Sequence, residues 1–282
     1  MIRVDKVNDL ITYTHNIIDG RCRNKHYNSV YFHSNEELNA IFNEVDVTDK
    51  DVLTVLSSGD QALYMYDRGA RSIDLFDINK FTLYYFYLRV WTIKYLNKFY
   101  PELYFKNNFL ERLLKYVKPN TEEEMQTYLY WKEFALNFGA LSKQDLEELY
   151  ILGTSIYKNK IYDISKIKFR LEKEKHNFYN IDLSKKVSLE KKYDIVFVSN
   201  IGERILGLIK RNKSTDIIEI YKNNLFNLLK DNGIVIATNV ILCGPRKEEV
   251  EIFRSNFVKQ DLKSMCKFGK KKSPGYVYRK VS

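Results

Sequence analysis

Residues 51–80, DVLTVLSSGDQALYMYDRGARSIDLFDINK, decide the fold. They begin with a short apolar run rich in β-branched residues, Asp51–Leu56, which predicts a buried strand. A turn follows at Ser57-Ser58-Gly59-Asp60, and the helix-like stretch after it runs to Asp67. A second strand is predicted over Arg71–Asp77. This order of strand, tight turn, helix and strand indicates parallel strands joined by a right-handed crossover.

The same alternation returns in the second half of the chain. Tyr193–Ser199 and Ile234–Val240 are near-continuous apolar runs, as expected of parallel strands that are buried on both faces. His176–Asp182 is a weaker strand, Gly275–Val281 is a final one, and residues 215–230 have helical spacing. The sequence therefore predicts an α/β fold with a mostly parallel, Rossmann-like sheet that ends in an antiparallel strand.

Two segments differ from this pattern. Residues 1–45 have mostly helical spacing, and residues 97–175 combine helical periodicity with many charges and no convincing strand. We therefore expect a helical N-terminal segment over 1–45 and a helical insertion over 97–175. The Rossmann-like domain would then comprise residues 46–96 and 176–282.

Composition and charge restrict the class of protein. The chain has 282 residues, of which 45% are hydrophobic and 29% charged, as is ordinary for a globular protein. Cys22, Cys243 and Cys266 form no CxxC pair, so the sequence predicts neither a zinc site nor a disulfide framework. No signal-peptide core and no membrane-spanning run is visible, and a cytoplasmic location is expected. The net charge of +10 suits nucleic acid, an anionic membrane surface or an anionic substrate, although a solvated lysine face explains it equally.

The residues at the predicted strand ends indicate a ligand. Gly59 follows the first strand and permits close backbone approach, and the helix after it offers free N–H groups to a carboxylate. Asp77 ends the second strand at about the spacing at which an acid meets an adenosine ribose in dinucleotide folds. A carboxylate suits ribose because it accepts two hydroxyl hydrogens. The single glycine disfavours a pyrophosphate, whereas S-adenosylmethionine carries no phosphate. A simple turn at Gly59 and a helix cap at Asp77 are the alternatives.

The order of these features resembles the class I S-adenosylmethionine-dependent methyltransferase fold over residues 50–96 and 176–281. The resemblance implies that the Gly59 turn lies beside the methionine part of the donor and Asp77 beside the ribose. It places Asp182 near the adenine and Ser199-Asn200 in the reaction cleft. The first motif departs from the usual glycine-rich form. The candidate cofactor-binding residues are Ser57, Ser58, Gly59, Asp60, Asp77, Asn79, Asp182, Ser199 and Asn200.

A narrower resemblance concerns Ser58-Gly59-Asp60 and Asp77-Ile78-Asn79. These motifs are similar to those of the betaine-lipid synthases, which are S-adenosylmethionine:diacylglycerol 3-amino-3-carboxypropyl transferases. The segment Tyr31–Glu36, just before the sheet, is similar to an aromatic, polar segment of that family. The resemblance implies transfer of the 3-amino-3-carboxypropyl group, with residues 31–36 folded over the methionine tail.

The resulting functional hypothesis is an S-adenosylmethionine-dependent transferase with a small-molecule or lipid acceptor. His33, Glu36 and Glu203 are the candidate catalytic bases, needed where the acceptor is a hydroxyl or an amine. One alternative is a methyltransferase acting on a small molecule or nucleic acid; nucleic acid is less favoured because no NPPY-type motif is found. The other is a non-catalytic protein that binds an adenosine ligand. The sequence names neither an acceptor nor an oligomeric state.

Overall fold

The apolar runs of the sequence form the strands of one sheet. The computed structural model describes residues 34, 36–97, 108–137, 163–173, 176–199, 201–202, 205, 216–238, 257–268 and 271–280. The strands are β1 (Asp51–Val55), β2 (Ser72–Phe76), β3 (Phe178–Tyr179), β4 (Tyr193–Ser199), β5 (Leu229–Thr238), β6 (Phe257–Phe268) and β7 (Lys271–Lys280).

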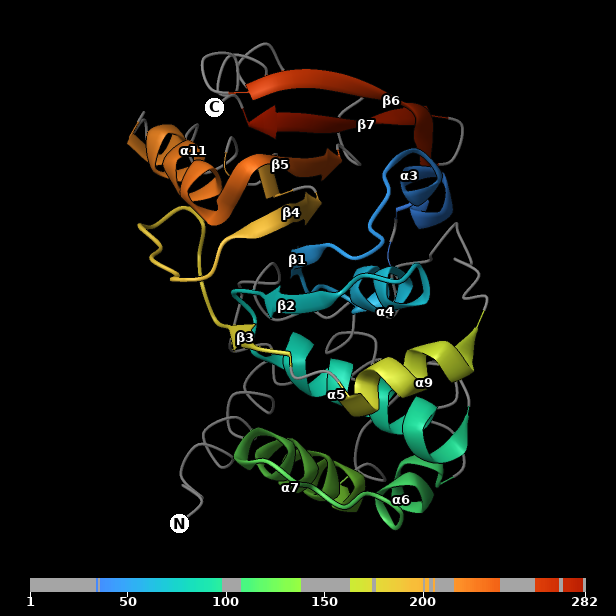
Figure 1. Ribbon diagram of the computed structural model, residues 1–282. Helices are drawn as coiled ribbons and strands as arrows, with labels where there is room; N and C mark the ends of the chain where they lie inside the picture. The colour runs from blue at the N-terminus through green and yellow to red at the C-terminus, as the bar shows by residue number, and fades with distance from the viewer. Residues whose placement is uncertain are drawn as a thin grey trace.

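The order of the strands defines the architecture. The sheet runs β3-β2-β1-β4-β5-β7-β6. The first five of these strands are mutually parallel, whereas β7 is antiparallel to both β5 and β6. Figure 1 shows β6 and β7 at one end of the sheet and β3 at the other. The predicted Rossmann-like sheet of the class I type, with a reversed strand near the C-terminus, is confirmed.

Helices connect the strands and cover the sheet. They are α3 (Leu38–Glu44), α4 (Asp60–Asp67), α5 (Phe81–Leu96), α6 (Phe109–Leu114), α7 (Glu122–Asn137), α9 (Ile164–Lys173) and α11 (Asp216–Leu228). The described residues of the expected insertion belong to α6, α7, α9 and short connections, and none of them is in a strand. No helix in the described part of the chain is both long and apolar enough to cross a membrane.

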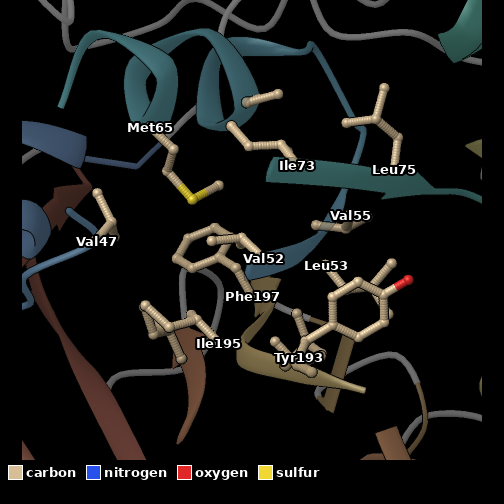
Figure 2. Packing of buried hydrophobic residues seen from close by; sticks show 14 of the residues in the cluster. Val47, Val52, Leu53, Val55, Met65, Ile73, Leu75, Tyr193, Ile195 and Phe197 are labelled. Atoms are coloured by element: carbon tan, nitrogen blue, oxygen red, sulfur yellow. The ribbon is translucent and has the colours of Figure 1, made fainter. Parts of the chain in front are cut away.

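The main hydrophobic core lies between the sheet and its flanking helices. Val52 and Leu53 of β1, Ile73 of β2 and Phe197 of β4 are completely buried. Figure 2 shows Met65 of α4 pointing from the helix toward Val52 and Phe197. Every residue of α4 is buried, including its polar ones. The strand–turn–helix unit at the start of the sheet is therefore largely buried, with Asp51 and Ser57 partly exposed.

Helix α5 is buried on two faces. Phe86 and Val90 pack into the main core, while Tyr84 and Trp91 join a second cluster with Trp131 of α7. Such a helix is apolar all round, which explains why its sequence lacks a polar stripe. In Figure 1, α6 and α7 lie beyond α5, at the end of the molecule remote from β6 and β7. These helices shield the outer face of α5 from water.

Parts of the sheet differ from the sequence prediction. Strand β6 was not predicted, because residues 257–268 interleave charged and apolar residues as an edge strand does. Strand β3 covers only two residues of the predicted 176–182. Strand β5 begins at Leu229, five residues before the predicted start, since the backbone enters the sheet directly after α11.

Candidate functional site

The strand order reverses between β1 and β4, where ligands bind in open α/β sheets. The carboxyl ends of the parallel strands meet there. Ser57 follows β1 with a left-handed φ of 47°, and Ser199 ends β4 with a φ of 52°. Left-handed backbone at non-glycine residues persists only where surrounding contacts enforce it, and it is concentrated at functional sites. Two such residues on neighbouring strands therefore mark this edge as the candidate site.

Asp77 connects the ends of β1 and β2. Its Oδ2 accepts a hydrogen bond from the Ser57 N–H at 2.9 Å, and its Oδ1 accepts one from the Asn79 N–H at 2.9 Å. The carbonyl of Asn79 accepts a 2.6 Å hydrogen bond from the Thr82 hydroxyl in the first turn of α5. Asp77 is 9% exposed. The carboxylate is thus fixed at the strand ends, beside the turn that precedes α4.

The glycine of the turn packs against helix α5. Gly59 has a φ of 80°, and its N–H donates to the Leu56 carbonyl at 2.6 Å. A Cβ added at Gly59 would lie 2.6 Å from Cδ2 of Phe86 on α5. The position that a side chain would occupy is thus filled by the Phe86 ring, and the expected close approach of a ligand to the backbone of the turn stays a prediction.

Glu36 is the centre of a buried polar network. Its Oε1 accepts hydrogen bonds from the hydroxyls of Ser199 and Thr238, at the ends of β4 and β5. Its Oε2 accepts from Gln61 Nε2 at 3.0 Å and from the Ser34 hydroxyl at 3.3 Å. Burial raises the pKa of Glu36, and these four hydrogen bonds oppose that rise. The carboxylate joins the segment before α3 to the strand ends; its role as a general base stays a prediction.

Asp60 and Arg89 form a buried ion pair under the turn. Arg89, from the middle of α5, donates from Nη2 to Asp60 Oδ1 and from Nη1 to the Ser58 carbonyl. Asp60 Oδ2 accepts from the Ser58 hydroxyl at 3.1 Å and from the Ser34 N–H. The side chains of Arg89 and Asp60 are 0% and 5% exposed. The pair therefore ties α5, the turn and the segment before α3 to one another.

The other predicted residues lie in different positions. Asp182 follows β3, and its Oδ1 accepts hydrogen bonds from the Ser184 N–H at 2.9 Å and the Ser184 hydroxyl at 2.6 Å. It is partly buried in a local turn, and its predicted contact with adenine stays a prediction. His33, Asn200 and Glu203 lie outside the described residues. In the part of the chain that the structure describes, no group of three or more His, Cys, Asp or Glu could hold a metal ion.

Three residues of the network were missed by sequence reasoning. Arg89 is a charge in the middle of a largely apolar helix whose other charged residue, Lys94, lies in the last turn, and that central position was the available signal. Gln61 directly follows the predicted turn, and Thr238 lies inside a predicted strand. Neither had a local signal, because their partners are distant in sequence.

No protein-family model and no curated protein matches the chain. Solved structures are similar in space. A TehB-like SAM-dependent methyltransferase from Corynebacterium glutamicum gives a TM-score of 0.43 at 12% identity, covering 98% of this chain and 99% of that one. The glycopeptide N-methyltransferase MtfA gives 0.45 at 9% identity, covering 89% and 93%. The N-methyltransferase NodS from Bradyrhizobium japonicum WM9 gives 0.41 at 7% identity, covering 87% and 92%. The strand order and register define the fold independently of these superpositions.

Proposed function

We propose that the chain is an S-adenosylmethionine-dependent transferase whose donor binds at the carboxyl ends of β1 and β2. The observation that carries this proposal is the link between Asp77 and the turn after β1. A carboxylate at the end of β2 is held 2.9 Å from the backbone of a turn that opens directly into a helix. One side of this unit suits the ribose hydroxyls, and the helix N-terminus suits the donor's carboxylate.

Gln61 provides a test of whether the residues fit this donor. The side chain is 1% exposed, and its Nε2 donates to Glu36 and to the Ser34 hydroxyl. Within the described residues, Gln61 Oε1 is buried without a hydrogen-bond partner. A buried carbonyl without a partner costs about 1–3 kcal/mol, so an N–H group is favoured beside it. The α-ammonium of the methionine part is such a group, and the site therefore fits the donor.

When bound, the donor supplies an already activated carbon on its sulfonium, so the protein has mainly to bind and orient. Asp77 would hold the ribose, the first turn of α4 the donor's carboxylate, and Gln61 its ammonium. Ser34 and Glu36 are buried against the turn and the strand ends, where they exclude water. Ser199, at the end of β4, faces the same network through Glu36.

We further propose that the transferred group is 3-amino-3-carboxypropyl and that the acceptor is a small molecule or lipid. Support comes from the similarity of Ser58-Gly59-Asp60 and Asp77-Ile78-Asn79 to the betaine-lipid synthases. The described members of the segment Tyr31–Glu36 add to it, because Ser34 and Glu36 contact the turn, as folding over the methionine tail requires. Methyl transfer is the competing reaction on the same sheet.

Mass spectrometry of the spent donor tests both that the chain is a transferase and that the transferred group is 3-amino-3-carboxypropyl. Purified protein is incubated with S-adenosylmethionine and cell extract as the source of acceptor, with the Asp77→Ala variant as control. Methylthioadenosine that depends on Asp77 is expected. S-adenosylhomocysteine that depends on Asp77 would replace the transferred group by methyl, and absence of both products would contradict a transferase.

A further inference from the structure

Arg89 is a fully buried charge in the middle of a largely apolar helix. Its guanidinium lies against the ring of Tyr85, 5.8 Å from the ring centroid, and bonds to Asp60 and to the Ser58 carbonyl. Burying a charge is costly unless the pairing is good, and many buried ion pairs can be replaced by apolar residues without loss of stability. The position of Arg89 therefore calls for an explanation beyond packing.

The turn held by Arg89 has a strained backbone. The strain lies at Ser57, a non-glycine residue with a φ of 47°, whereas Gly59 adopts its φ of 80° without steric cost. The peptide between Ser58 and Gly59 is fixed at both polar groups, since its carbonyl accepts from Arg89 and its N–H donates to Leu56 at 2.6 Å. Asp77 fixes the preceding residue, because its carboxylate accepts a hydrogen bond from the Ser57 N–H. A strained turn keeps one conformation only where contacts of this kind over-determine it.

Helix α5 is a rigid support for these contacts. Phe86, one turn before Arg89, fills the space beside Gly59. On the opposite face, Trp131 of α7 donates from Nε1 to the Tyr84 carbonyl at 2.9 Å, and Tyr130 stacks on the Tyr84 ring. Helices α6 and α7 thus brace α5 from behind, as their arrangement in Figure 1 shows.

From these contacts we propose that Arg89 is a positioning residue, which sets the turn Ser57–Asp60 in the conformation that binds the donor's methionine tail. The inference rests on the proposed function. Arg89 acts through Ser58 and Asp60 and touches no reacting atom. The ribose is assigned to Asp77, which bonds to the Ser57 N–H, whereas Arg89 bonds to the Ser58 carbonyl and to Asp60. Loss of Arg89 should therefore weaken recognition of the tail and spare recognition of the nucleoside.

Two ligands separate positioning from mere stabilisation. S-adenosylhomocysteine has the full methionine tail, whereas methylthioadenosine keeps the nucleoside and lacks the amino acid. Their affinities are measured by calorimetry for the parent, for Arg89→Lys and for the double variant Arg89→Met/Asp60→Asn, which removes both charges and leaves neither partner ionised. The matched control is Lys230→Met/Asp51→Asn, an ion pair at the amino ends of the strands.

In the double variant, the affinity for S-adenosylhomocysteine should fall about tenfold or more, while that for methylthioadenosine stays within about twofold. Arg89→Lys keeps the charge but loses the planar fork, so it should show a smaller loss with the same selectivity. The control should bind both ligands as the parent does. Equal losses of affinity for the two ligands, or no loss, would overturn the positioning role. If the double variant does not fold, Arg89→Lys is judged by the same comparison of its losses of affinity for S-adenosylhomocysteine and methylthioadenosine. A parent that binds neither ligand would instead refute the proposed function.

Discussion

The two ends of the parallel strands carry charges in contrasting ways. At the amino ends, Asp51 pairs with Arg71 at 2.5 Å and with Lys230 at 2.6 Å, and the two basic side chains are 56% and 36% exposed. At the carboxyl ends, the side chains of Asp60 and Arg89 are only 5% and 0% exposed. Solvent screens the charges at the amino ends, so these ion pairs contribute little to stability and tolerate changes in their geometry. The pair at the carboxyl ends is desolvated, so its pairing depends on good geometry, which suits a site that is held ready for a ligand.

Removing one carboxylate at each end of the strands should give the largest difference in stability between the two clusters. Asp60→Ala leaves Arg89 as an unpaired buried charge, and a loss of about 3–5 kcal/mol in the free energy of unfolding is expected. Asp51→Ala should cost only a fraction of that, because its partners are exposed. Urea unfolding of both variants measures the difference. Equal losses would mean that the two clusters contribute equally to the free energy of unfolding.

A substitution in the turn should have the next largest effect. Gly59→Val forces a branched residue into a left-handed conformation and against Phe86, so about 3 kcal/mol of stability should be lost. Gly69 is the matched control, since it has a φ of 89° but nothing closer than 3.8 Å to an added Cβ. Gly69→Val should lose less, as judged by thermal unfolding. A variant at Gly59 as stable as the parent would show that Phe86 moves aside.

The pH dependence of stability should have opposite signs at the two ends and is the smallest effect. Hydrogen bonding to Arg71 lowers the pKa of Asp51, so its contribution is present above the unfolded value near 3.8 and is lost as the pH falls through the folded pKa. Burial raises the pKa of Glu36, so its contribution is present below the unfolded value near 4.5 and is lost as the pH rises through the folded pKa.

Replacing Glu36 or Asp51 with its neutral amide should remove the contribution of that residue to the pH dependence of stability. Relative to the parent, Glu36→Gln should gain stability as the pH rises above about 4.5, whereas Asp51→Asn should gain as the pH falls below about 3.8. Urea unfolding at a series of pH values measures both. If the two variants follow the parent in parallel, neither carboxylate titrates differently in the folded and unfolded states.

The contrast between the two ends also explains what could be predicted from the sequence. The strands β1, β2 and β4 follow from apolar runs, and Asp77 follows from its place after such a run, because these signals are local. The contacts of Glu36 with Ser199 and Thr238 span more than 160 residues, and only the folded sheet brings them together. Arg89 was missed for the same reason, since a single arginine in an apolar helix does not identify its partner. The local sequence pattern thus locates the turn Ser57–Asp60. The residues that hold this turn cannot be found in the same way, because their contacts are tertiary.

Calorimetric titration with S-adenosylhomocysteine tests whether Asp77, at the carboxyl ends of the strands, holds the donor. The parent, Asp77→Ala and Asp51→Ala are compared, so that one carboxylate from each end of the strands is removed. We predict that the parent binds, that Asp51→Ala binds equally well, and that Asp77→Ala loses roughly 2 kcal/mol, or about thirtyfold in affinity, because hydrogen bonds to a charged group are lost. A folded Asp77→Ala variant that binds as tightly as the parent, or a parent that does not bind at all, would contradict the account.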